Sequence, residues 1–275
     1  MREPSNAALA ADFMTVAFYS REQILGSGRR RSLYKADQRD VCLIVAGEPG
    51  AEERALVSRV AAAYSLTNEI QIVTSECRST TNLVMVFVPR EVNGRGSGAI
   101  AEYANSKLIG SIQDHKVPEP FKASYSRAIH NRFIYPSSDP GWAQKICMFG
   151  PSFKVDGAIF TMITISMNFG YMQRCIYEET LQALGLPFDS TKSWPSIIRV
   201  DHSGHRVDTL NAPSSYDLLY LRVLYDPRLR SGMSYDEVKQ LVEGIIAELR
   251  PDESRPPDLG RLYTKAPPSF SQVQD

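Results

Sequence analysis

The sequence predicts an α/β fold, more closely an α+β fold with a mixed, twisted sheet and a helical C-terminal part. Short runs rich in β-branched residues alternate with longer segments of helical periodicity. Hydrophobic residues make up 43% of the 275 positions and charged residues 23%, so the chain can bury a sizeable core.

The first half of the chain is expected to form a β-α-β-β unit. Three short β-branched segments are predicted strands: residues 41–46, 70–74 and 83–88. Residues 52–65 follow a helical pattern between the first two strands. The apolar stripe of this helix consists of Leu56, Val57, Val60, Ala61 and Tyr64.

The second half alternates one further strand with helices. Residues 158–167 are rich in β-branched residues and predict a buried central strand. Gly185 and Pro187 end the helix that follows this strand. The predicted helices are residues 99–109, 121–130, 171–184, 216–225 and 235–249.

We expect one folded domain with a segment of irregular structure at each end. Residues 1–38 are polar and contain Gly26, Gly28 and a run of three arginines, which predicts an irregular N-terminal arm. Residues 39–250 are the predicted single domain. Residues 251–275 contain two proline pairs and are expected to form a flexible tail.

Charge and hydropathy exclude several classes of partner. Lys plus Arg and Asp plus Glu both total 31, so the zero net charge gives no reason to expect nucleic acid or an anionic membrane. No apolar run reaches the roughly 20 residues of a transmembrane helix. Residues 1–13 lack a signal-peptide pattern, so either the protein is cytosolic or it is exported with its signal removed.

The most informative stretch is residues 175–189. Glu178 and Gln182 stand four residues apart, which places them on one face of a helix at a spacing that lets two side chains share a metal ion. Glu179 lies beside them, where a general base would stand. Gly185 would let the chain turn and bring Phe188 or Asp189 back toward the same face.

This stretch resembles the metzincin zinc peptidases, whose signature is His-Glu-x-x-His-x-x-Gly-x-x-His/Asp. Glu178 and Gln182 stand at the first two ligand positions and Glu179 at the position of the general base. Gly185 matches, and the third ligand position holds Phe188, followed by Asp189. Two downstream segments, residues 196–198 and 210–225, resemble the Met-turn and the closing helix.

Over roughly residues 38–250 the chain is more closely similar to a bacterial family, domain of unknown function 2927 (DUF2927), some members of which are predicted lipoproteins. The resemblance is carried by residues 175–190, 195–197, 217–228 and 232–233. It implies a metzincin-like layout with a degenerate motif, export to the periplasm or cell envelope, and no established activity.

The departures from the zinc-binding motif indicate a protein without catalytic activity. Gln182 offers a neutral amide oxygen, Phe188 offers no ligand, and Glu178 with Asp189 would make a weak site. Without tightly bound zinc, Glu179 has no activated water to deprotonate. We therefore expect no cofactor, and a binding or scaffolding role toward a protein or peptide partner.

Two alternatives remain open. In the first, the protein is a metal-dependent peptidase with Glu178, Gln182 and Asp189 as ligands, Glu179 as the general base, and additional ligands from the His202–His205 loop. In the second, Glu178 and Glu179 are solvated helix charges. The second alternative predicts that Glu178→Ala changes stability by no more than ~0.5 kcal/mol.

The four cysteines contain no Cys-x-x-Cys pair, so a zinc ribbon is not expected. Cys42 lies in an apolar run and fits the core as a free thiol. The even count permits two disulfides in an oxidising compartment, with three possible connectivities, or four buried thiols. If the protein is exported, as the family resemblance implies, we expect a disulfide between Cys147 and Cys175 that joins the helix of the motif to the strand before it.

Overall fold

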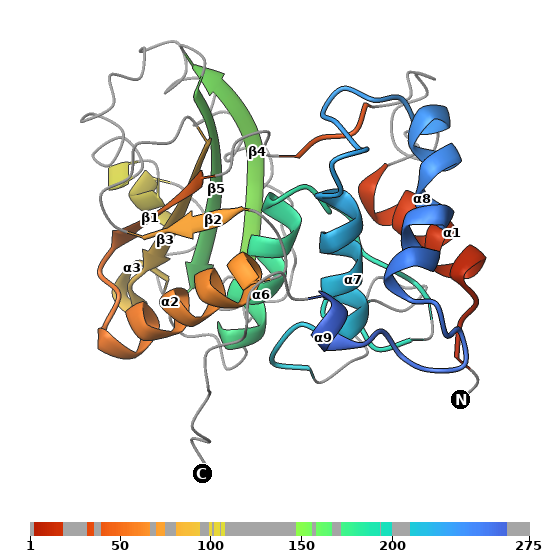
Figure 1. Cartoon of the computed structure of the whole chain (residues 1–275). Helices are drawn as coiled ribbons and strands as arrows, with labels where there is room; N and C mark the ends of the chain where they lie inside the picture. The colour runs from red at the N-terminus through yellow and green to blue at the C-terminus, as the bar shows by residue number, and fades with distance from the viewer. Residues whose placement is uncertain are drawn as a thin grey trace. The chain divides into compact units, whose positions relative to one another are not determined.

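A computed structural model describes the backbone in thirteen segments (Figure 1). They are residues 3–18, 32–35, 40–66, 70–74, 81–93, 99–100, 102–104, 106–107, 147–155, 158–166, 172–192, 194–199 and 210–262. The chain divides into two compact units, where the sequence predicted one domain over residues 39–250. Unit 1 comprises Met1–Arg39, Ala62–Gln71 and Leu184–Asp275, and unit 2 comprises Asp40–Ala61 and Ile72–Ala183.

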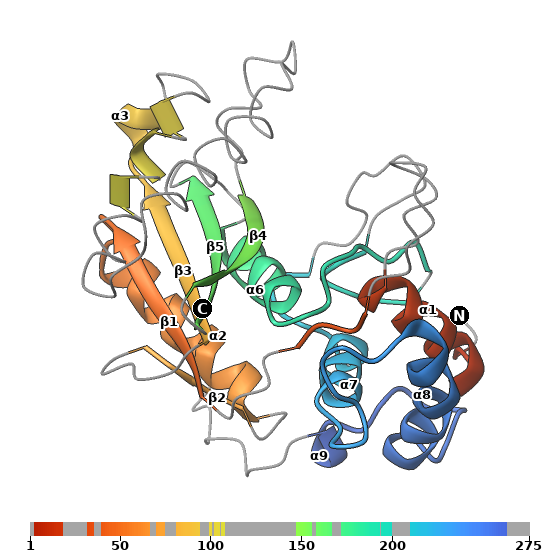
Figure 2. The same cartoon turned by 90° about the horizontal axis from the view of Figure 1, so that it is seen from above.

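Unit 2 is built on a mixed sheet with the strand order β2-β1-β3-β5-β4 (Figure 2). The strands are β1 (Asp40–Gly47), β2 (Gln71–Val73), β3 (Thr81–Val88), β4 (Cys147–Val155) and β5 (Ala158–Ser166). β3 pairs in parallel with both β1 and β5, and β4 pairs antiparallel with β5. The sheet confirms the α/β class, and β5 lies inside the sheet as predicted.

The centre of the sheet excludes water almost completely. Every side chain from Leu83 to Val88 on β3 is at most 1% exposed, which fits a strand covered on both faces. At the end of β1, Gly47 has φ +86°, and a Cβ there would stand 2.2 Å from the Phe87 carbonyl oxygen. Only glycine tolerates both this backbone conformation and this close approach.

Two helices follow the predicted pattern closely. Helix α2 (Ala51–Leu66) buries the five residues of its predicted apolar stripe. Helix α6 (Met172–Ala183) packs against β4 and β5 in unit 2. A single turn, α3 (Arg90–Asn93), follows β3. The predicted helix at 99–109 is helical at its described residues, and the one at 121–130 lies outside the described part.

The described part of unit 1 holds four further helices besides the last residues of α2, 62–66. The four helices are α1 (Asn6–Ala17), α7 (Ser215–Leu224), α8 (Tyr235–Leu249) and α9 (Leu259–Leu262). α1 packs against α8, and α7 packs against α8 and α9. Ser214 and Ser234 begin α7 and α8 with capping boxes, in which each serine and the acid three residues later satisfy each other's backbone N–H.

Both predicted chain ends require correction. Residues 6–17 form α1, so the prediction of an irregular arm is wrong there: Ser5 caps the helix, and Leu9 and Phe13 are fully buried. Within the predicted flexible tail, residues 259–262 form the helical turn α9, in which Leu262 is fully buried. Residues 263–275 lie outside the described part. No helix in the described segments is long and apolar enough to cross a membrane.

Candidate functional site

Helix α6 carries three of the predicted site residues, and every position from Arg174 to Ala183 is buried. Glu178 is 2% exposed, Glu179 4% and Gln182 7%. A helix that carries two carboxylates and an amide is not expected to be buried on all sides unless these groups have polar partners. The alternative in which Glu178 and Glu179 are solvated helix charges is therefore wrong.

Glu178 lies beside a cation on its own helix. The Arg174 Nε lies 3.6 Å from Glu178 Oε2, and the two side chains are 4% and 3% exposed. The pair spans one turn, since Arg174 precedes Glu178 by four residues. The sequence shows an oppositely charged pair at this spacing. From this pair Arg174 could have been predicted as the partner of Glu178.

The remaining predicted site residues stand after α6. The helix ends at Ala183, and Gly185 then takes φ +127°, which confirms the sharp turn predicted there. Phe188 is half-buried and its backbone N–H donates to the Val16 carbonyl at 3.3 Å. Asp189 is exposed, and belongs to unit 1, whereas Glu178, Glu179 and Gln182 belong to unit 2.

The donor set does not fit a zinc ion. Of the three ligand positions, one holds a carboxylate 3.6 Å from an arginine, one an amide and one a phenylalanine. A guanidinium at this distance competes with a dication for the same carboxylate, and an amide oxygen is a poor zinc ligand. Within the described residues no three His, Cys, Asp or Glu side chains gather in a metal-binding group. His202 and His205 lie outside these residues.

A second polar cluster lies in unit 1, and the sequence analysis missed it. Asp12 on α1 is fully buried and accepts hydrogen bonds from Ser190 Oγ at 2.9 and 2.8 Å and from Tyr220 Oη at 2.8 Å. Burial raises the pKa of Asp12, although the two hydroxyls oppose that shift. The three residues of this cluster, Asp12, Ser190 and Tyr220, are far apart in the sequence, so no local sequence pattern could predict that they meet.

Asp217 holds the turn at residues 196–198, the segment that resembles the Met-turn. Its carboxylate accepts from Ser196 Oγ at 2.5 Å, from the Ile197 N–H at 3.0 Å, and from Ser214 N–H and Oγ at 2.7 and 2.8 Å. Burial raises the pKa of Asp217, and these four donors oppose the shift. Ile197 and Ile198 are fully buried, so this turn belongs to the core of unit 1.

Comparison with known proteins identifies the family. The family model described as "Protein of unknown function (DUF2927)" matches residues 6–244. The chain belongs to the DUF2927 family. The match begins at the first residue of α1, so this helix belongs to the DUF2927 domain and is not an arm attached to it. No curated protein and no solved structure matches the chain.

Proposed function

We propose that this DUF2927 protein is a non-catalytic, metallopeptidase-like protein of the cell envelope that acts by binding or scaffolding a protein or peptide partner. The observation that carries the proposal is the Arg174–Glu178 pair at the first ligand position of the metzincin-like motif. A residue that must bind zinc is deprotonated and free to coordinate the ion. Here the carboxylate already has a cation beside it.

The order of elements supports the metzincin-like part of the proposal. The resemblance implies a strand, a helix, two strands, and then a strand that leads into the helix of the motif. β1, α2, β2, β3, β5 and α6 follow one another in that order, with β4 before β5. Fold similarity does not transfer activity, so the function depends on the side chains of α6.

The alternative is a hydrolase with an atypical metal site, in which Glu178, Gln182 and Asp189 bind the ion and Glu179 is the general base. The burial of Glu179, at 4% exposure, favours this alternative, because a carboxylate is seldom buried without a role. Its ligand set would include Asp189, an exposed residue in the segment after α6.

Proteolysis of a mixed peptide library, followed by mass spectrometry, separates the two functions. The full chain and Glu179→Gln are incubated with the library, each with and without added zinc. Glutamine matches the size of glutamate and cannot act as a base, so the pair is a matched control. We expect identical peptide patterns. Zinc-dependent cleavage by the wild-type chain that is absent in Glu179→Gln would establish the hydrolase.

A further inference from the structure

The carboxylate of Asp12 is buried with hydroxyl partners only. It is 0% exposed, and the two side chains that donate to it, Ser190 and Tyr220, are neutral. A buried ionised carboxylate without a hydrogen-bonded cation loses its hydration at a large cost in free energy. Protonation removes that cost.

The charged and titratable groups around Asp12 come from two parts of the chain, α7 and the segment after α6. On α7, Tyr220 donates to it and Asp217 adds a second negative charge that raises its pKa. From the segment after α6, the exposed Lys192 lowers its pKa. The buried positions of α8, which packs against α1, are all apolar: Val238, Val242, Ile245 and Ile246.

Both protonation states of Asp12 can satisfy the hydroxyls around it. The ionised carboxylate accepts from Ser190 and Tyr220, as the distances show. The neutral acid gains one O–H donor, which can point at Ser190 Oγ, because a serine hydroxyl also accepts and its hydrogen rotates. Burial and the charge of Asp12 keep Tyr220 protonated by raising its pKa, so this phenol remains a donor.

We propose that Asp12 is a proton-linked latch, which fastens α1 to Ser190 and to α7 more tightly as the pH falls. Its position fits that role, because it joins α1, near the start of the chain, to Ser190 and Tyr220, which are separated from it by 178 and 208 positions. The proton comes from the solvent and binds the carboxylate. The inference does not depend on the proposed function.

The direction of the pH dependence follows from the linkage between proton binding and folding. Burial raises the pKa of Asp12 above the 3.8 of a free side chain, so the folded state holds its proton at a pH where the unfolded chain has released it. The stabilisation that the Asp12 proton contributes is therefore fully present below the pKa of Asp12 in the unfolded chain, and it is lost as the pH rises through the pKa of Asp12 in the folded state. One such proton changes the unfolding equilibrium constant by at most about tenfold per pH unit.

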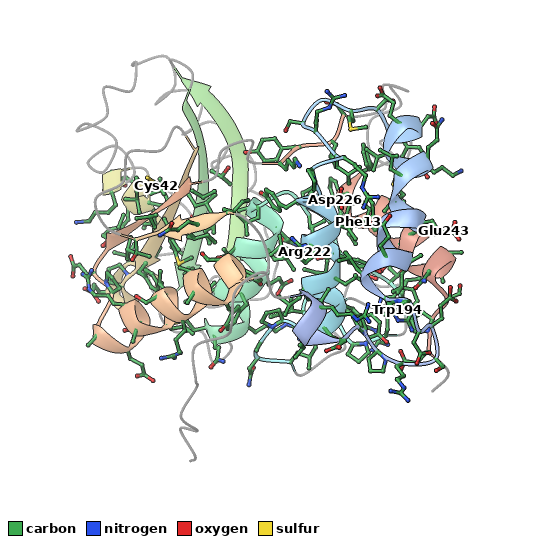
Figure 3. All side chains as sticks on the ribbon, viewed as in Figure 1. Phe13, Cys42, Trp194, Arg222, Asp226 and Glu243 are labelled. Carbon is green, nitrogen blue, oxygen red and sulfur yellow. The ribbon has the colours of Figure 1, made fainter. Side chains whose placement is uncertain are left out.

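Denaturant unfolding of the full chain at several pH values between 4 and 8 tests the latch. Of the two tryptophans, Trp194 lies buried in unit 1, so a Trp142→Phe background makes its fluorescence report on that unit. In this background we compare three proteins: the parent chain, the Asp12→Asn variant, and the control Glu243→Gln, which removes an exposed carboxylate from α8 (Figure 3). In the parent chain we expect the equilibrium constant of unfolding to rise with pH. The Asp12→Asn variant should show a smaller rise, and Glu243→Gln should show the same rise as the parent.

If the equilibrium constant of unfolding rose equally with pH in the parent chain and in Asp12→Asn, the proposal would be overturned. If Asp12→Asn does not fold, ¹³C NMR of the parent chain with labelled aspartate carboxyls gives the answer directly. The assigned Asp12 signal is then expected to titrate above the ordinary range of aspartate. Titration at or below that range would equally overturn the latch.

Discussion

Asp217 shows how one residue can join two segments that are distant in sequence. It is the third residue of α7 and completes the capping box with Ser214, while its carboxylate also binds Ser196 and Ile197. The capping box follows from the local Ser-x-x-Asp spacing and so could be predicted. The contact with residues 196 and 197 is non-local, and no sequence pattern announced it.

Gly185 is a position where the backbone decides the residue. Its φ of +127° is strained for any side chain, and a Cβ would lie 2.4 Å from the Tyr34 carbonyl oxygen. We expect Gly185→Ala to lower the free energy of unfolding by at least about 2 kcal/mol, measured by chemical denaturation.

Gly244 on α8 is the matched control, because a Cβ there meets no atom within 4 Å. Alanine in the interior of a helix is favoured over glycine, so Gly244→Ala should stabilise the protein by roughly 0.5–1 kcal/mol. A Gly185→Ala variant as stable as the wild type would show that the turn after α6 does not need its left-handed conformation.

At the scale of elements, α6 is the helix whose charges carry the functional argument. Removing one partner of a buried ion pair leaves the other uncompensated, which costs about 3–5 kcal/mol. We therefore expect Glu178→Ala to destabilise the chain by roughly 3 kcal/mol, with Arg174→Met similar, both measured by denaturation. The Arg174→Met/Glu178→Ala double variant should lose clearly less than the sum of these two losses. Strictly additive losses would mean that the two side chains do not interact.

A disulfide between Cys147 and Cys175 remains a prediction at this scale. β4 begins at Cys147, α6 packs against β4, and Cys175 is fully buried on α6. Cys42 is a free, buried thiol, as expected from its apolar run. Mass spectrometry of non-reduced, digested protein from its native compartment should show the 147–175 cross-link. Two free thiols at these positions would contradict the prediction, and with it one argument for export.

The elements that the sequence predicted are those with a clear local period. β1, β3, α2, α7 and α8 form where their β-branched or helical patterns predicted them. β4 was missed because Gly150 and Pro151 interrupt its pattern, at the point where its register with β5 shifts between Phe149 and Ser152. α1 was missed because apolar residues cover most of its circumference and leave no amphipathic stripe.

At the scale of the whole molecule, the division into units was not predictable from local patterns. Unit 1 collects three segments, from the start, the middle and the end of the chain. The buried guanidinium of Arg250 illustrates how they are joined: it donates to the Pro4 carbonyl at 2.7 Å and to the Glu253 carbonyl at 2.7 Å. Contacts across 246 positions arise from tertiary packing, which composition and periodicity do not encode.

The candidate site was predicted in part, and for a physical reason. The i, i+4 spacing correctly placed Glu178 and Gln182 on α6, because helical geometry is local. Their burial and the approach of Arg174 depend on side-chain packing, so they became visible only in the structure.

Elemental mass spectrometry of the full chain, purified without affinity tag or chelator and then incubated with zinc, decides between the binding protein and the hydrolase. We expect no bound zinc beyond that in a matched Glu178→Ala preparation, because Arg174 already pairs with this carboxylate. One zinc ion per chain, lost on Glu178→Ala, would overturn the non-catalytic proposal and make the hydrolase the better description of this DUF2927 protein.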